Sequence, residues 1–190
     1  MPRTLSETDG NLFYKLFLPM LDYVNDRFQI VPGLHDIAGA KSLDPGKVKK
    51  IADRIWQDTA LIDDYVANRE LPGDHKEIIL SWKNNIYSKF SVERHLAKGS
   101  IFIDLQDSRV YQVCGIKSSW EEMFGDYPLP IIIDAILIPF KDVIITDGLV
   151  YPYLNLLIGP GYRKDLKNLY MEAKESGQVI RTLAADESVR

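Results

Sequence analysis

Residues 129–161 read LPIIIDAILIPFKDVIITDGLVYPYLNLLIGPG, and this stretch decides the fold. Short apolar runs rich in Ile and Val are separated by a Pro-Phe-Lys-Asp turn and by Asp-Gly, and the stretch ends at Gly-Pro-Gly. Such runs between turn residues predict buried β-strands. Asp-Gly favours a hairpin because a type I′ turn needs positive φ at both central residues. We therefore expect a three-strand meander over residues 130–138, 143–146 and 149–158.

Composition limits the classes of protein to consider. The chain has 190 residues with 46% apolar and 26% charged residues, which is ordinary for a globular domain. A net charge of −4 argues against a nucleic-acid or membrane partner, because such partners select for a basic patch. Cys114 is the only cysteine, which excludes an internal disulfide and a cysteine-based zinc cluster.

Two observations predict where the protein works. The first ten residues, MPRTLSETDG, are polar and acidic, unlike a signal peptide. The longest apolar run is far shorter than the ~18 residues needed to span a bilayer. We therefore expect a cytoplasmic protein.

Helical periodicity dominates the first part of the chain. Apolar residues at 3/4 spacing predict a helix over residues 11–28, with a kink or a restart at Pro19. A second helix is expected to start at Asp44-Pro45 and to end before Leu71-Pro72-Gly73. A third is expected from Asp74 to about residue 87.

Around residue 88 the period changes from helical to alternating. Residues 90–96 suit a strand, residues 101–105 and 109–116 suit a hairpin, and residues 118–125 suit one or two helical turns behind a serine cap. A final helix is expected over residues 163–176.

The predicted fold class is α+β. About three N-terminal helices precede a small antiparallel SH3-like barrel or curled sheet of five to six strands, and a C-terminal helix follows. We expect a helical region over residues 1–87 and a sheet region over 88–183, together forming one compact unit. Residues 184–190 are expected to be a disordered tail.

The run Leu137–Leu149, LIPFKDVIITDGL, resembles a segment shared by a group of uncharacterised bacterial proteins, in which it reads approximately LLPFKGKIIYDGL. Residues 101–103 and 110–113 resemble the strands that precede it there, so the resemblance covers about residues 88–175. It supports the fold and implies no activity. Some members carry a Cys-rich zinc motif, but this chain lacks those cysteines, so the resemblance implies no metal function.

Three carboxylates are candidates for chemistry. Asp104, Asp134 and Asp147 lie in or beside apolar strands, and clustered carboxylates can bind Mg²⁺ or share a proton. The alternative is local hydrogen bonding in turns for Asp104 and Asp147, and a polar edge or a pair with Arg94 or Lys141 for Asp134. Asp134 fits this alternative least well, because a buried carboxylate needs a partner.

A second candidate is the strand-to-helix turn Gly159-Pro160-Gly161-Tyr162-Arg163-Lys164. Free N–H groups at a helix start favour anions, and Gly159, Gly161, Arg163 and Lys164 could hold a phosphate or a carboxylate. The alternative is that the glycines only shape the turn, since the motif matches neither a Walker loop nor a dinucleotide fingerprint.

The remaining candidates have structural interpretations. His35, His75 and His95 lack metal-ligand spacing, and Cys114 in a strand behaves as a small apolar side chain. Aromatic residues gather around the meander and suit core packing or a protein contact; they are Tyr127, Phe140, Tyr151, Tyr153 and Tyr162.

Two functions remain open. The first is a non-catalytic binding or adaptor protein whose partner is another protein, supported by the lack of a nucleophile–base pair, metal spacing or cofactor motif. The second is a small-ligand or phosphate-binding protein, or a metal-dependent enzyme, that uses the strand carboxylates or the Gly159–Lys164 turn. We favour the first, with no cofactor and no assigned catalytic or metal residue. Convergence of the three aspartates in a cleft would favour the second.

Overall fold

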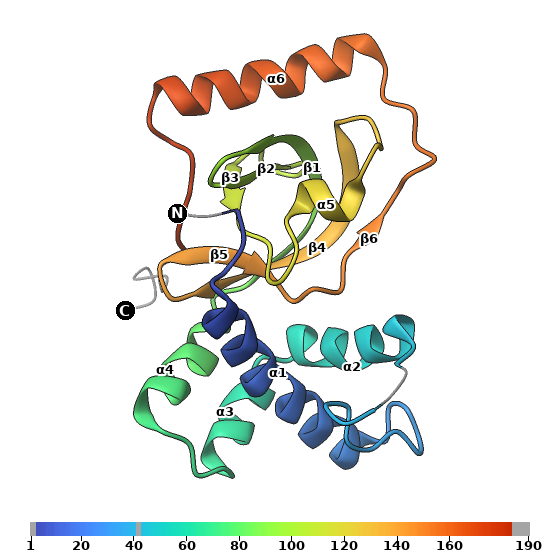
Figure 1. Ribbon diagram of the computed structural model, residues 1–190, viewed down its shortest axis with the longest axis vertical. Coiled ribbons are helices and arrows are strands. Elements are labelled where there is room, and N and C mark those ends of the chain that lie inside the picture. Colours follow the sequence, from blue (N-terminus) through green and yellow to red (C-terminus); the bar gives the residue numbers. More distant parts are fainter. Residues whose placement is uncertain (1–2, 41–42, 184–190) are drawn as a thin grey trace. The chain divides into compact units, whose positions relative to one another are not determined.

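The computed structural model describes residues 3–40 and 43–183, so the tail expected at 184–190 lies outside the described residues. It confirms a mixed α+β protein, with six helices and six strands in the described part of the chain (Figure 1). The elements are α1 (Glu7–Phe28), α2 (Pro45–Gln57), α3 (Ala60–Ala67), α4 (Gly73–Ser81), β1 (Ile86–Leu96), β2 (Gly99–Asp104), β3 (Val110–Val113), α5 (Trp120–Phe124), β4 (Ile131–Phe140), β5 (Val143–Thr146), β6 (Tyr151–Pro152) and α6 (Pro160–Glu175).

The chain forms two compact units. Among the described residues, one contains 8–40 and 43–83, and the other contains 3–7 together with 84–183. In the first unit, α1 runs from Glu7 to Phe28 without a restart at Pro19. Its apolar face buries Phe13 and Phe17, whose rings both lie edge-on to Trp82 within 6 Å.

The second predicted helix is two helices. α2 begins behind Asp44, whose carboxylate accepts a hydrogen bond from the N–H of Gly46 at 2.9 Å, as expected for an N-cap. It ends at Asp58, where φ is −141°, and α3 starts after Thr59. Asp and Thr are weak helix formers, so they permit a break that the apolar spacing, which continues through them, does not reveal.

The sheet is mixed rather than antiparallel. Its order is β1-β2-β3-β5-β4-β6, and β1 also pairs with β4, so the pairings of five strands return to their start. The neighbouring pairs are antiparallel except β3 and β5, which are parallel at Val113 and Ile144. A closed circuit of five strands cannot alternate direction throughout, so one pair must be parallel. The hydrophobic periodicity of the sequence does not reveal how many strands close the circuit or which pair is parallel.

The expected meander is also wrong in its last step. β4 and β5 form a tight hairpin at Lys141, whose φ is 51°. β5 and β6 both pair with β4, so the Asp147-Gly148 turn does not join two neighbouring strands. β6 contains only two residues, Tyr151 and Pro152, which pair with Asp134 and Ile133 of β4.

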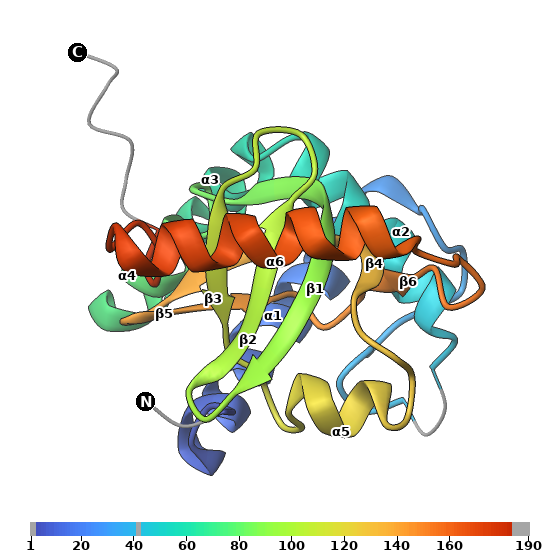
Figure 2. The ribbon, with the colours of Figure 1, turned by 90° about the horizontal axis from the view of Figure 1, so that it is seen from above.

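Both faces of β2 are covered. Phe102 joins an interior cluster with Phe90, Tyr111 and Trp120, while Ile101 and Ile103 face α6. Figure 2 shows α6 lying across β1, β2 and β3. The buried side of α6 consists of Leu166, Tyr170 and Ala173, as its helical spacing predicts.

Candidate functional site

Asp104 is a buried structural carboxylate. Its side chain accepts hydrogen bonds from the Ser88 hydroxyl and from the N–H of Gln106, each at 2.8 Å. The second bond closes a local turn after β2. Asp104 is 3% exposed, and these two bonds compensate for the loss of water around it.

Asp134 lies on the outer surface of the sheet in a contact with two other side chains. The Tyr153 hydroxyl donates a hydrogen bond to it, and the Lys89 ammonium lies 3.7 Å from its other oxygen. Lys89 also lies 4.3 Å above the centre of the Tyr153 ring. The hydrogen bond with Tyr153, followed by the charge of Asp134, raises the pKa of Lys89. Lys89 comes from β1, Asp134 from β4 and Tyr153 from the chain just after β6, so these contacts connect the three segments.

The three aspartates do not converge. Phe90 pairs with both Asp104 and Ile133, so Asp104 points to the same side of the sheet as Ile133. Asp134 follows Ile133 and points to the opposite side. Asp147 is buried and accepts a hydrogen bond from the N–H of Leu149 at 2.9 Å. Within the part of the chain that the structure describes, no group of three His, Cys, Asp or Glu side chains could hold a metal ion.

Gly159 is the N-cap of α6, and Pro160 to Lys164 form its first turn, so the helix begins three residues before the predicted start and follows a loop rather than a strand. Arg163 turns back from it: its guanidinium donates to the carbonyl oxygens of Ile158 at 2.9 Å and Leu129 at 3.4 Å. The side chains of Arg163 and Lys164 are exposed, and Gly159 and Gly161 both have open space at the position of a Cβ. The glycines therefore do not form a tight cradle around a phosphate.

His95 and Cys114 are positioned for structural roles. The His95 Nδ1 lies 2.7 Å from the hydroxyl of buried Ser100, its partner across the β1–β2 pair. Burial and the charge of Arg3 lower the pKa of His95. Burial also raises the pKa of the Cys114 thiol, which disfavours the reactive thiolate.

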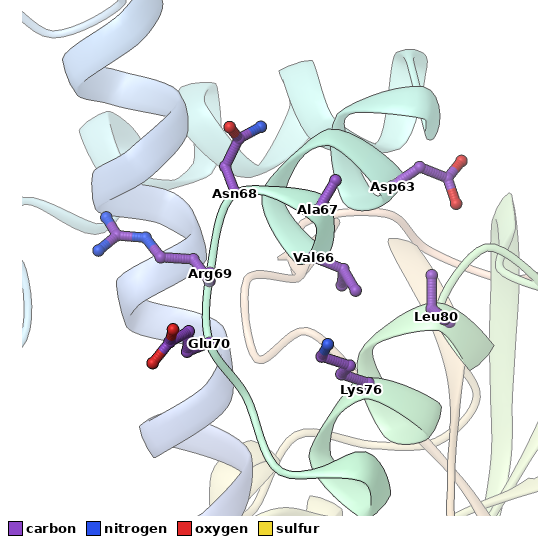
Figure 3. A pocket seen from close by; sticks show the side chains of 8 residues that line it. All are labelled: Asp63, Val66, Ala67, Asn68, Arg69, Glu70, Lys76 and Leu80. Atoms are coloured by element: carbon purple, nitrogen blue, oxygen red, sulfur yellow. The ribbon is translucent and has the colours of Figure 1, made fainter.

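The helical unit carries an open groove of about 610 Å³ between α3 and α4. Figure 3 shows Val66 and Lys76 directed toward this space. The Arg69 side chain points away from the groove, and its guanidinium lies over the rings of Tyr23 and Tyr65. Asp63 is paired with Lys83 at 2.7 Å. The groove is thus lined by a few apolar side chains and by charged side chains of both signs, which are Asp63, Arg69, Glu70 and Lys76.

The largest concentration of exposed apolar side chains lies in residues 151–162, between β6 and the first turn of α6. Of ten exposed large apolar side chains in the described residues, five belong to this segment. They are Tyr151, Leu154, Leu156, Leu157 and Tyr162. Leu157 is 94% exposed. Sequence reasoning missed the leucines because it assigned them to a buried strand, and the clustered Gly and Pro after Ile158 were the available signal for a loop.

The aromatic residues that the sequence places around the meander differ in their exposure. Phe140 is fully buried, whereas Tyr127, Tyr151 and Tyr162 are exposed. Tyr153 is half-buried against Lys89, and its ring lies edge-on to that of Tyr151 at 5.2 Å.

Comparisons with protein-family models, curated proteins and solved structures found no match. The resemblance of Leu137–Leu149 to a bacterial group therefore stays a prediction. No helix in the described residues combines the length and apolar character needed to cross a bilayer.

Proposed function

We propose that this chain is a non-catalytic binding protein that acts through contacts with another protein. The observation that carries the proposal is the 151–162 segment, with its five exposed apolar side chains. Exposed apolar side chains that gather in one segment commonly mark an interaction site, and tyrosine is enriched at protein interfaces.

The backbone of the segment is held at both ends, which supports this function. The Tyr153 N–H donates to the carbonyl oxygen of Ile132 at 2.8 Å, and the Leu156 N–H donates to that of Tyr153 at 3.1 Å. At the other end Arg163 bonds to Ile158 and Leu129. An anchored backbone loses little conformational entropy when a partner binds, so more of the contact energy appears as affinity.

The sheet unit would serve as the scaffold. We propose that its closed circuit of five strands is a small SH3-like barrel with α6 across one side. Strand pairing that leaves few free edges provides a rigid base from which a loop can present its side chains.

The ligand-binding or enzymatic alternative has weaker support. Asp104, Asp134 and Asp147 each make internal hydrogen bonds, and Arg163 bonds to the chain's own carbonyl oxygens. We propose a cytoplasmic protein that uses neither a nucleic acid nor a metal ion, in keeping with its net charge of −4.

Site-specific photocrosslinking tests the proposed function. A photoreactive phenylalanine analogue would replace Leu157, and in a matched variant it would replace Tyr87, an exposed side chain of the same unit. We expect irradiation in an extract of the native cell to give a discrete protein adduct from position 157 and none from position 87. Equal diffuse labelling at both positions, or no adduct at either, would contradict a protein-binding role for this segment.

A further inference from the structure

The exposed segment lies in a locally cationic part of an acidic protein. From Gly148 to Lys164 the sequence has no Asp or Glu, although the whole chain has a net charge of −4. Arg163, Lys164 and Lys167 bring three positive charges to the start of α6, and Asp165 brings one negative charge, which leaves a local charge of +2. The start of a helix adds a partial positive charge of its own.

Two of these cations are positioned to meet a ligand. Lys164 and Lys167 are both exposed and lie three residues apart, so they project from neighbouring positions of α6. Among the described residues neither takes part in an ion pair within 4 Å, whereas Lys83 and Lys89 do. Arg163 connects this helix start to the apolar segment through the carbonyl oxygen of Ile158.

We propose that the 151–162 segment, with Lys164 and Lys167 at its border, is the docking surface for an acidic, apolar peptide segment of a partner protein. The inference rests on the proposed function and specifies its partner. Apolar side chains at the centre of an interface supply most of the affinity, and charges at the rim select the partner and speed association. Exposed apolar side chains, beside lysines that form no ion pair with the residues the structure describes, therefore fit leucines or aromatic residues flanked by Asp or Glu.

A peptide fits this surface better than an anionic membrane does. Arg163 donates to the Leu129 carbonyl oxygen, and the sequence before Leu129 is acidic, with Glu121, Glu122 and Asp126. A broad anionic lipid surface that reached these carboxylates as well as the lysines would be repelled by them. A peptide can follow the apolar strip and the lysines alone.

The test is a selection in which the protein itself chooses among sequences. The full-length protein would be immobilised and used to select binders from a phage library of short random peptides. We expect the enriched peptides to combine Asp or Glu with Leu, Phe or Trp. Selection on Leu156→Ser/Leu157→Ser should enrich none of them.

Matched charge variants then separate the role of the lysines from the effect of net charge. Lys164→Glu/Lys167→Glu should weaken binding of an enriched peptide about tenfold and reduce its salt dependence, measured by fluorescence polarisation. Lys47→Glu/Lys50→Glu makes the same charge change at the same spacing on exposed positions of α2 and should leave the affinity unchanged.

Four other results would contradict the inference, and each would indicate a different role for the surface. Neutral peptides that bind equally to the Lys164/Lys167 variant would remove the acidic partner and leave the proposed function standing. Enrichment of no peptide would refute peptide docking, while photocrosslinking from position 157 judges the proposed function separately. Leu157-dependent sedimentation with phosphatidylserine vesicles would assign the surface to lipid. Leu157-dependent dimerisation in analytical ultracentrifugation would assign it to a second copy of the chain.

Discussion

Two stretches of nearly identical composition, close together in the sequence, differ completely in burial. Residues 131–140 and residues 149–158 each contain eight apolar residues and one proline. Nine of the ten residues of the first stretch are buried, and none of the second is. The difference lies in strand pairing. β4 bonds to β1 along one edge and to β5 and β6 along the other, whereas only Tyr151 and Pro152 of the second stretch form a strand.

The apolar content of a segment sets the free energy that it can gain from burial. Pairing with neighbouring strands determines whether the segment is buried. A strand with a neighbour on each side has its backbone polar groups satisfied, so it can lie inside the fold. After Pro152 the chain leaves the sheet, and the Leu156 N–H bonds to the Tyr153 carbonyl oxygen rather than to a neighbouring strand. The leucines of this segment therefore remain exposed.

The largest test of the comparison is a pair of truncations. Ile133 is fully buried in the interior cluster, and Leu157 is 94% exposed. Ile133→Ala should lower the free energy of unfolding by about 2–5 kcal/mol, because it leaves a cavity. Leu157→Ala should change it by less than about 0.5 kcal/mol. Urea denaturation measures both, and similar losses would show that residues 149–158 are packed.

A second test concerns a polar group inside the buried region. Tyr111 is fully buried, its hydroxyl has no hydrogen-bond partner within the described residues, and burial raises its pKa to about 12. The folded state therefore binds the Tyr111 proton more tightly than the unfolded state, whose ordinary pKa is about 10. This contribution to stability is complete below pH ~10 and is lost as the pH rises toward about 12.

Tyr111→Phe should remove that alkaline loss, which amounts to roughly 2 kcal/mol. At neutral pH the variant should be as stable as the wild type or slightly more so, because it deletes an unsatisfied buried hydroxyl. Urea denaturation from pH 8 to pH 12 would compare the two proteins. A large loss at neutral pH would reveal a partner for the hydroxyl.

The smallest effect on stability is expected where the two stretches contact each other, at the hydrogen bond between Tyr153 and Asp134. Tyr153→Phe removes the hydrogen bond to Asp134 that fastens β6. The Tyr153 amide bonds to Ile132, and its hydrogen exchange should accelerate about 2–5-fold without a change in global stability. Tyr151→Phe, two residues earlier in β6 and exposed, is the control and should leave that rate unchanged. Equal rates in both variants would mean that the Asp134 contact does not hold β6.

Local signals predicted several helix starts and two of the buried faces, although the third helix ends at Ser81 instead of near residue 87. Asp44 caps α2, and Ser119 with Glu122 forms the expected capping box before α5. The alternation after residue 88 became β1, and the helical spacing of Leu166 and Tyr170 became the buried side of α6. These features depend on residues within one or two turns of each other, which a sequence displays directly.

The candidate site was less predictable. The expectation that Asp134 needs a partner was sound, but its partners, Lys89 and Tyr153, come from β1 and from the chain just after β6 rather than from Arg94 or Lys141. The exposure of Leu156 and Leu157 had no local signal beyond the nearby glycines and prolines. Which side chains contact each other across two strands depends on the register of the pair. That register is set only when the two strands pair in the folded protein.

Propensity and periodicity act over a few residues, so the α+β class, the helix caps, and the apolar runs that became β4 and β5 can be predicted from the sequence. Three features require the folded structure: the parallel pairing of β3 with β5, the positions of Asp104 and Asp134 on opposite sides of the sheet, and the exposure of residues 151–162. Each of these depends on which distant segments become neighbours, and the free energy of that choice belongs to the whole sheet rather than to any one stretch of residues.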